Sequence, residues 1–234
     1  IALLTGCNGG SKANSRSSAV GGVNSATSGA IGLIVSATPL ASSDAPMTND
    51  VTALALAFTA NGVDATLQGV TIHASGTVDE SQAIGSVRLV GDDDKNGKFT
   101  AGEPVLATVA APAFSVNDGD VTLTLATPIN LSAGASLHLL VVVDATAIGQ
   151  TAMARIGKTI ALSVDAAASI PASSGGQATA AIGPFPLADS VTLFLNDHLL
   201  ISEIVGDPTE AEFIEIFNPT GHAVDLSTVY VTDA

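Results

Sequence analysis

Residues 92–103 carry oxygen-bearing groups at the close, regular spacing that a bound metal ion requires. The candidate ligands, with a glycine at position 97 between them, are Asp92, Asp94, Asn96, Lys98, Thr100 and Glu103. Lys98 would contribute its backbone carbonyl, and the others would contribute carboxylate, amide or hydroxyl oxygens. A hard cation such as Ca²⁺ takes six to eight oxygen ligands at about 2.3–2.6 Å, and the glycine permits the sharp turn that gathers them. We therefore predict a structural calcium site in this loop.

The segments on either side of the loop decide which kind of calcium site it forms. Residues 87–90 and 105–109 have the composition of strands, and Pro104 directly follows the last ligand. The loop is similar to that of EF-hand proteins, with Phe99 as the apolar residue packed behind it, but the strands argue against a helix–loop–helix unit. It resembles instead the calcium loops in β-sandwich repeats of bacterial surface adhesins. The alternative is a solvated acidic hairpin without an ion.

Short β-branched runs separated by turn residues make up most of the chain from residue 31 onwards. In residues 121–125, Val and Leu alternate with Thr, which is the two-residue period of a half-buried strand. The strands that we expect are 32–37, 51–59, 66–74, 86–90, 105–110, 120–126, 137–143, 159–164 and 190–195. Their spacing favours an antiparallel sandwich over βαβ units, which need helical crossovers. We predict an all-β fold with an Ig-like antiparallel β-sandwich over residues 31–195.

Several segments within this sandwich carry more specific expectations. Residues 51–59 are apolar on both faces, which predicts a central strand, and residues 117–119 predict a turn into the next strand. Residues 145–155 form the stretch best suited to a short helix, and residues 170–183 predict a loop or an edge segment. The acidic pair at positions 79–80 predicts a solvated turn.

Composition limits the classes of partner and of function. The chain of 234 residues has 7 Lys+Arg against 22 Asp+Glu, and its net charge of −15 argues against nucleic acid or an anionic membrane surface as the main partner. Its 47% of hydrophobic residues and mean hydropathy of +0.48 predict a folded chain. The longest dense apolar run, residues 137–143, is far shorter than the roughly 18 residues of a membrane-spanning helix.

The side chains that usually carry catalysis show no recognisable arrangement. Histidine occurs at positions 73, 138, 198 and 222 without the spacing of a zinc motif, and His138 is expected on the face of an apolar strand. The sequence contains no G-x-S-x-G motif, no P-loop and no dinucleotide-binding glycine pattern in a strand–helix context. We therefore expect no enzymatic activity.

The N-terminal residues carry the most specific motif of the chain. Residues 4–7 read Leu-Thr-Gly-Cys after an apolar start, and Cys7 is the single cysteine. This motif resembles the lipobox of bacterial lipoproteins, which implies a diacylglyceryl group on the Cys7 sulfur and removal of residues 1–6 as the end of a signal peptide. Each buried CH₂ contributes about 0.8 kcal/mol, so two or three acyl chains anchor a protein stably. The alternative is a buried strand with an inert cysteine.

Residues 7–30 continue the chain as the lipidated cysteine and a flexible tether rich in Gly, Ser, Asn and Ala. The tether contains Lys12 and Arg16 and no acidic residue. Asn8 takes the position where the lipoprotein family has Asp in proteins retained at the inner membrane. We therefore expect an extracellular protein held at the outer membrane or cell surface through the lipid on Cys7.

The C-terminal segment, residues 198–234, has a pattern of its own. Residues 202–204 read Ser-Glu-Ile, residues 212–219 read EFIEIFNP, and residues 225–227 read Asp-Leu-Ser. This order resembles the opening of a lamin-tail domain in its bacterial extracellular form, with Thr-Val at 228–229 in place of the family's Gly-Trp. Such a domain is an Ig-like sandwich of about 100 residues, so the resemblance implies an incomplete second β-sandwich. The alternative is one more hairpin of the first sandwich.

Taken together, these patterns predict a non-enzymatic, lipid-anchored bacterial surface protein that is structural or adhesive and stabilised by Ca²⁺. Its partners would be the membrane, through the lipid, and a protein or other cell-surface ligand. One alternative is the non-catalytic N-terminal region of a longer extracellular hydrolase, a nuclease or phosphatase, as the lamin-tail resemblance implies. Another is a subunit of a self-assembling surface filament, joined through open strand edges.

The lipid anchor can be tested on protein isolated from its native cells. Mass spectrometry should find a mature N-terminus at Cys7 that carries the added mass of acyl chains, because the peptidase cuts before the modified cysteine. A Cys7→Ser variant should stay uncleaved and lose its lipid. A native chain that keeps residues 1–6 and an unmodified thiol would overturn the lipoprotein prediction.

Overall fold

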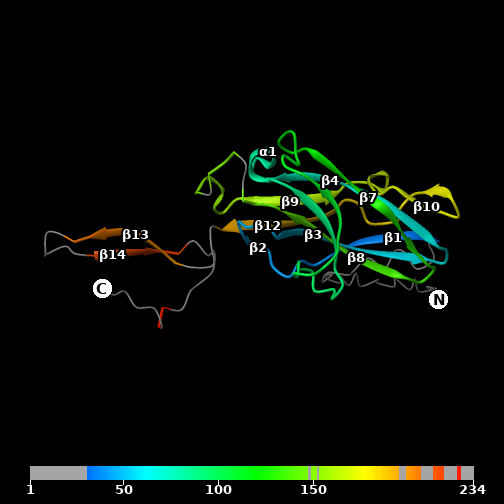
Figure 1. The fold of residues 1–234 in the computed structure, drawn as a ribbon, viewed down its shortest axis with the longest axis horizontal. Coiled ribbons are helices and arrows are strands. Elements are labelled where there is room, and N and C mark those ends of the chain that lie inside the picture. Colours follow the sequence, from blue (N-terminus) through cyan, green and yellow to red (C-terminus); the bar gives the residue numbers. More distant parts are fainter. Residues whose placement is uncertain are drawn as a thin grey trace, which may run out of the picture.

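The computed structural model describes residues 31–146, 149–151, 153–194, 199–206, 213–218 and 226–227. Within these residues two large β-sheets pack against each other, which confirms the predicted all-β sandwich (Figure 1). The lipobox and tether of residues 1–30 lie outside the described residues, as do His198, His222 and the segment 228–234. Among the described residues, no helix is long and apolar enough to cross a membrane.

The first sheet has five strands, and every neighbouring pair in it is antiparallel. Their order is β1 (Gly32–Thr38), β3 (Val51–Asn61), β8 (Ser136–Val143), β5 (Val87–Gly91) and β6 (Val105–Val109). β3 lies inside this sheet and is buried or half-buried along its length, as predicted for a central strand. The outer edge of β1 is covered, because the Val35 N–H donates to the Ile182 carbonyl at 2.9 Å and the Ile182 N–H donates to the Leu33 carbonyl at 2.8 Å.

The second sheet is built around the long strand β4. Its order is β11 (Gln177–Thr179), β10 (Ala172–Ser174), β4 (Ala65–Gly76), β9 (Thr159–Val164), β12 (Leu187–Phe194) and β2 (Asp44–Pro46). A further strand, β7 (Asp120–Leu131), also pairs with β4, and β2 runs parallel to β12. Residues 170–183, predicted as a loop or an edge segment, contain the β10–β11 hairpin at the edge of this sheet.

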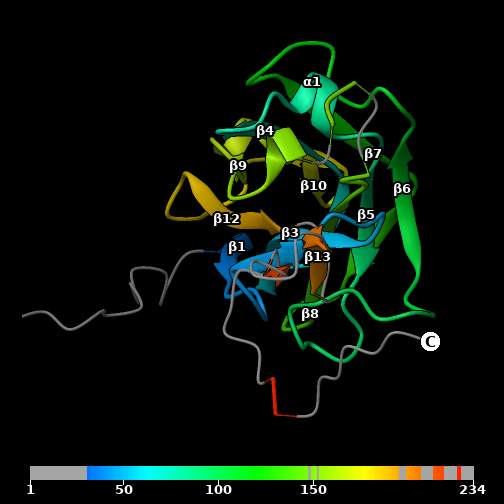
Figure 2. The same ribbon diagram turned by 90° about the vertical axis from the view of Figure 1, so that its left-hand side faces the viewer.

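The core lies between the two sheets and consists mainly of aliphatic side chains. Figure 2 shows the two layers, with β4 and β9 in one and β3 and β8 in the other. The largest fully buried apolar side chains include Phe58, Phe114, Leu56, Ile72 and Leu123. Along the first part of β7 the Val and Leu side chains are buried and the Thr side chains are exposed, as the two-residue period predicted.

The connection between β8 and β9 differs from the short helix that we expected over residues 145–155. The described part of this stretch contains only a 3₁₀ turn, Met153–Arg155. The one α-helix among the described residues is α1, Glu80–Ala83. Arg155 is 2% exposed, and its guanidinium donates to the backbone carbonyls of Ala145, Thr146 and Thr151. The Ala145 and Thr146 carbonyls bond to this side chain, while the Thr151 carbonyl also accepts from the Ala154 N–H at 3.2 Å within the 3₁₀ turn. The described part of the segment therefore packs as a loop around one buried cation.

The prediction of a solvated turn at residues 79–80 is wrong for Glu80, because its side chain is completely buried. Asp79 Oδ1 accepts from the Ser81 N–H at 3.1 Å and caps α1. Glu80 Oε2 accepts from the Asp118 N–H at 3.0 Å, which ties α1 to the predicted turn at 117–119. Its Oε1 has no hydrogen-bond partner among the described residues. Burial raises the pKa of Glu80, and the nearby carboxylates of Asp118 and Asp79 act in the same direction.

The C-terminal segment contains an antiparallel hairpin of β13 (Leu200–Val205) and β14 (Phe213–Phe217), which lies at one end of the sandwich in Figure 1. Five of its large apolar side chains are exposed, from 39% at Phe217 to 66% at Ile204. Glu203 pairs directly with Glu215 across the two strands. Among the described residues this hairpin forms a sheet of its own, and a two-stranded hairpin by itself buries little apolar surface.

Glu80→Gln should raise the free energy of unfolding by about 1 kcal/mol at neutral pH, because the buried side chain would no longer carry a charge. The pKa of Glu80 in the folded state lies above its ordinary value of 4.5. The wild type therefore loses stability as the pH rises from 4.5 through that folded-state pKa. The stability gain of Glu80→Gln should therefore vanish in acid, where Glu80 is protonated in both the folded and the unfolded state. Urea unfolding in neutral and in acidic buffer measures it. The exposed control Asp44→Asn should show no gain, and an equal gain for Glu80→Gln in both buffers would contradict the prediction.

Candidate metal centre

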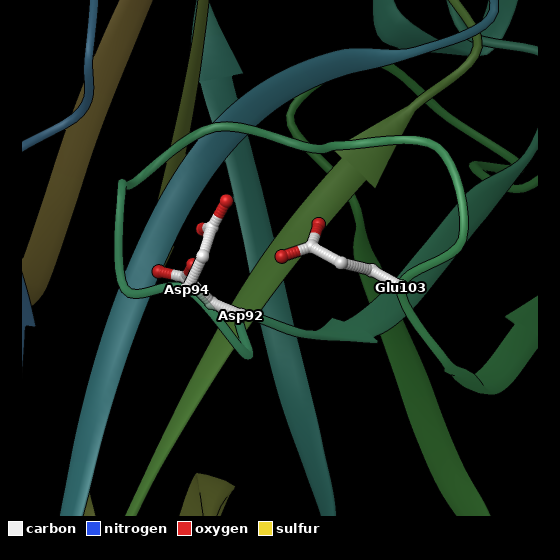
Figure 3. A group of neighbouring side chains, drawn as sticks. All are labelled: Asp92, Asp94 and Glu103. Atoms are coloured by element: carbon white, nitrogen blue, oxygen red, sulfur yellow. The ribbon is translucent and has the colours of Figure 1, made fainter.

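The loop at residues 92–103, here called the metal loop, connects β5 to β6 and is flanked by strands as predicted. It brings one carboxylate oxygen each from Asp92, Asp94 and Glu103 within 4.8 Å of one another. Figure 3 shows the Glu103 carboxylate directed across the loop towards the two aspartates. These three residues stand at the first, third and last positions of the predicted ligand set. The sequence spacing therefore predicted a real convergence of carboxylates.

Asp92 is the residue that organises the loop backbone. It is 4% exposed, and its own N–H donates to the His138 carbonyl of β8 at 2.9 Å. Its carboxylate accepts from the Asn96 N–H at 3.0 Å through Oδ1 and from the Gly97 N–H at 3.2 Å through Oδ2. The loop therefore closes around a carboxylate whose position is fixed by an interior strand of the first sheet.

Glu103 closes the other end of the loop. Its Oε2 accepts from the Thr100 N–H at 2.8 Å, and its own N–H donates to the Thr100 carbonyl at 3.2 Å. Its Oε1 is buried and has no hydrogen-bond partner among the described residues. A buried carboxylate oxygen without a partner carries a desolvation penalty of at least about 1–3 kcal/mol. This is the atom of the loop that a cation would satisfy.

Asn96, Lys98 and Thr100 are less completely arranged for a metal than the carboxylates are. The Asn96 amide nitrogen donates to Asp94 Oδ2 at 2.8 Å and to Thr100 Oγ1 at 3.2 Å, and its oxygen accepts from the Lys98 N–H at 2.7 Å. Asn96 and Thr100 thus lie beside Asp94 as predicted, but a cation would need the amide oxygen on the side where the nitrogen now lies. Lys98 is joined to this group through its N–H, and its side chain is exposed.

The metal loop also covers part of the outer face of the first sheet. Phe99, together with Leu40, packs on a second small apolar cluster formed by Ala55, Val90, Leu140 and Val142. The Phe99 N–H donates to Thr52 Oγ1 at 2.9 Å, and the Arg88 guanidinium lies 5.1 Å from the centre of the Phe99 ring. The sequence signal for this cluster was the two-sided apolarity of residues 51–59, which predicted a central strand but not what covers it.

Gly97 lets the loop approach the segment that follows β1. Its φ of +69° is left-handed, and a Cβ at this position would lie 2.7 Å from the Pro39 carbonyl oxygen. The Gly97 carbonyl in turn accepts from the Ala41 N–H at 3.2 Å. Glycine is therefore required here both by the turn and by the contact with the neighbouring backbone.

The donor set has the chemistry of a hard, oxygen-binding cation. In the part of the chain that the structure describes, the ion pairs are Arg88 with Asp50 and His73 with Asp120, so no basic side chain there forms an ion pair with the carboxylates of the metal loop. Three carboxylate oxygens within 4.8 Å of one another repel unless a cation or a proton intervenes. Oxygen donors without nitrogen or sulfur suit Ca²⁺ better than a transition metal.

A second polar group lies on the outer face of the second sheet, and sequence analysis missed it. His73 Nδ1 lies 2.8 Å from Asp120 Oδ1, and Ser163 stands opposite His73 on β9. Ser163 Oγ donates to Asp165 Oδ1 at 2.5 Å rather than to the histidine. The serine hydroxyl is therefore not hydrogen-bonded to the histidine in this arrangement.

Comparison with known proteins adds no family to these observations. No protein-family model matches the sequence of this chain. No curated protein sequence matches it either. The interpretation of the metal loop therefore depends on its own residues and contacts.

Gly97→Ala should lower the free energy of unfolding by more than the left-handed backbone alone explains, because the added Cβ also displaces the Pro39 contact. Gly157 is the matched control, since its φ is +72° and its Cβ would meet nothing within 4 Å. We expect a loss of about 1 kcal/mol for Gly157→Ala and at least about 2 kcal/mol for Gly97→Ala. Urea unfolding measures both, and equal losses would contradict the docking of the loop.

Proposed function

We propose that this chain is a non-enzymatic structural or adhesive module of the bacterial cell surface, stabilised by Ca²⁺ in the metal loop. The observation that carries the proposal is the convergence of Asp92, Asp94 and Glu103, together with the unpartnered, buried Oε1 of Glu103. Asn96, Thr100 and the Lys98 carbonyl would complete the ligand set. The ion would have a structural role.

Calcium would act by cancelling the repulsion among the carboxylates and fixing the metal loop on the first sheet. Because the loop carries Phe99 onto the second apolar cluster, an ordered loop also keeps that cluster covered. Binding to the folded state alone stabilises it by about 2.7 kcal/mol at a free Ca²⁺ concentration of about 100 times Kd. Extracellular modules with Kd of about 10⁻⁴–10⁻³ M remain occupied outside the cell.

The cellular location in this proposal comes from the lipobox at residues 4–7 and the tether that follows it. Lipid on Cys7 would hold the sandwich at the outer membrane or cell surface, where calcium is abundant and where a protein or other surface ligand is within reach. The metal loop and the lipobox are independent features of the sequence, and both favour an extracellular protein.

The C-terminal hairpin supports the alternative in which residues 198–234 belong to a second, lamin-tail-like module within a longer extracellular hydrolase. Its exposed apolar side chains, such as Ile201 and Ile204, are those of strands that still need a partner surface. Two of the sheet edges give the filament alternative little support. Ile182 covers the edge of β1, and Ser42 and Pro46 block that of β2, since Ser42 Oγ bonds the Asp44 N–H and carbonyl and proline has no N–H.

Calcium should raise the melting temperature of the EDTA-treated chain by several degrees, because the ion binds the folded loop and not the unfolded chain. Asp94→Ala should abolish the rise, since it removes one of the converging carboxylates. Scanning calorimetry with and without CaCl₂ makes the measurement.

Asp93→Ala is the matched control, because Asp93 is an exposed neighbour outside the ligand set. This variant should keep the calcium-dependent rise. The proposal is wrong if calcium leaves the wild-type melting curve unchanged, or if Asp93→Ala abolishes the rise as completely as Asp94→Ala does.

A further inference from the structure

A groove of about 570 Å³ lies between the metal loop and the segment that joins β1 to β3. One wall comes from residues 97–101 of the metal loop, and the other comes from residues 40–52. Small-ligand sites commonly have volumes of about 300–1,000 Å³. The groove is therefore large enough for a compact ligand of a few rings.

The lining of the groove combines an apolar floor with a polar rim. Pro46, Val51 and Phe99 are buried or half-buried and contribute the floor. The exposed polar side chains around it are those of Ser42, Asp44, Thr48, Asp50 and Lys98. A ligand that fits both parts has apolar patches and many hydrogen-bonding groups in a small volume.

The groove is close to neutral on a chain whose net charge is −15. Asp50 Oδ1 lies 2.6 Å from Arg88 Nη2 and is neutralised by it. Asp44 and Lys98, one acid and one base, have no ion-pair partner among the described residues. A strongly charged ligand would therefore find no matching excess of opposite charge here, whereas a neutral polar ligand could use both groups.

The edge of β2 argues against an extended peptide in the groove. The Asp44 N–H donates to Ser42 Oγ at 3.1 Å, and the Ser42 hydroxyl donates to the Asp44 carbonyl at 2.8 Å. Pro46, the last residue of β2, has no N–H to offer. A peptide that adds a strand needs free backbone groups along the edge, and these positions do not provide them.

We propose that this groove binds a short neutral oligosaccharide, with sugar hydroxyls paired to Asp44, Thr48 and Lys98 and the C–H faces of the rings on the apolar floor. A sugar ring joins dense hydroxyl groups to an apolar face, and roughly two or three rings fit the volume. The chain has no Trp and one Tyr, and Arg88 covers one face of Phe99. Hydrogen bonds, rather than aromatic stacking, would therefore select the sugar.

Binding in the groove would also depend on calcium, and this part of the inference rests on the proposed metal site. Residues 97–101 form a wall of the groove and lie between the candidate ligands Asn96 and Glu103. An ion that fixes these two residues fixes the wall between them. Coupling of this kind is reciprocal, so a bound sugar would strengthen calcium binding by the same factor.

The test uses the whole 234-residue chain and an array of neutral di- and trisaccharides that includes maltotriose, cellotriose and chitotriose. In CaCl₂ at least one saccharide should bind, and ¹H–¹⁵N NMR shifts should concentrate in residues 40–52 and 97–101. Asp44→Ala should weaken that saccharide at least tenfold. Asp120→Ala, which removes an exposed carboxylate outside the groove, should leave its affinity unchanged.

The inference is overturned if no saccharide on the array binds, or if the shifts fall outside residues 40–52 and 97–101. Its failure is distinguishable from that of the calcium site. A chain that is stabilised by calcium and binds no saccharide removes the groove proposal alone. A chain that binds a saccharide equally well in EDTA, with an unchanged melting curve, removes the metal site and leaves the groove.

Discussion

The rest of this structure depends on the burial of the first sheet from both sides. β3 and β8 carry apolar side chains on both faces, and water-exposed sheets of this composition are unstable. The second sheet covers one face, and Phe99 and Leu40 cover part of the other. The metal loop thus performs two tasks with neighbouring residues: its carboxylates converge on one side, while Phe99 packs on the other. Because both tasks belong to one loop, a change in the charge around the carboxylates would also affect how Phe99 packs on the sheet.

The same arrangement relates the metal loop to the groove. Gly97 lets the loop lie against the backbone at Pro39, and Thr52 Oγ1 accepts a hydrogen bond from the Phe99 N–H. As a result, two segments from different parts of the chain form the facing walls of the groove. The groove therefore forms where the metal loop packs beside the segment that follows β1. The charges follow the same division: the metal loop gathers unpaired carboxylates, whereas the groove beside it balances Asp44 and Asp50 with Lys98 and Arg88.

Local patterns in the sequence predicted the parts of the structure that local physics determines. The alternation in residues 121–125 predicted β7, and the ligand spacing predicted the convergence of Asp92, Asp94 and Glu103. What could not be predicted arises from distant contacts. Glu80 is buried with its carboxylate bonded to the Asp118 N–H of a turn far along the chain, and Arg155 bonds carbonyls in the described part of residues 145–155. Neither contact leaves a periodic signal in the sequence, and the groove likewise joins residues far apart in the chain.

The direction of the strands has a mechanical consequence. β1 begins beside the start of β4, because Gly32 pairs with Asn61 just before that strand, whereas β12 finishes near the opposite end of β4. Tension applied between residue 32 and residue 194 therefore pulls along the strands. The hydrogen bonds that join β1 to β3 on one side and to Ile182 on the other are loaded together, in shear, rather than opened one at a time. The metal loop, which joins β5 to β6, lies outside this line of load.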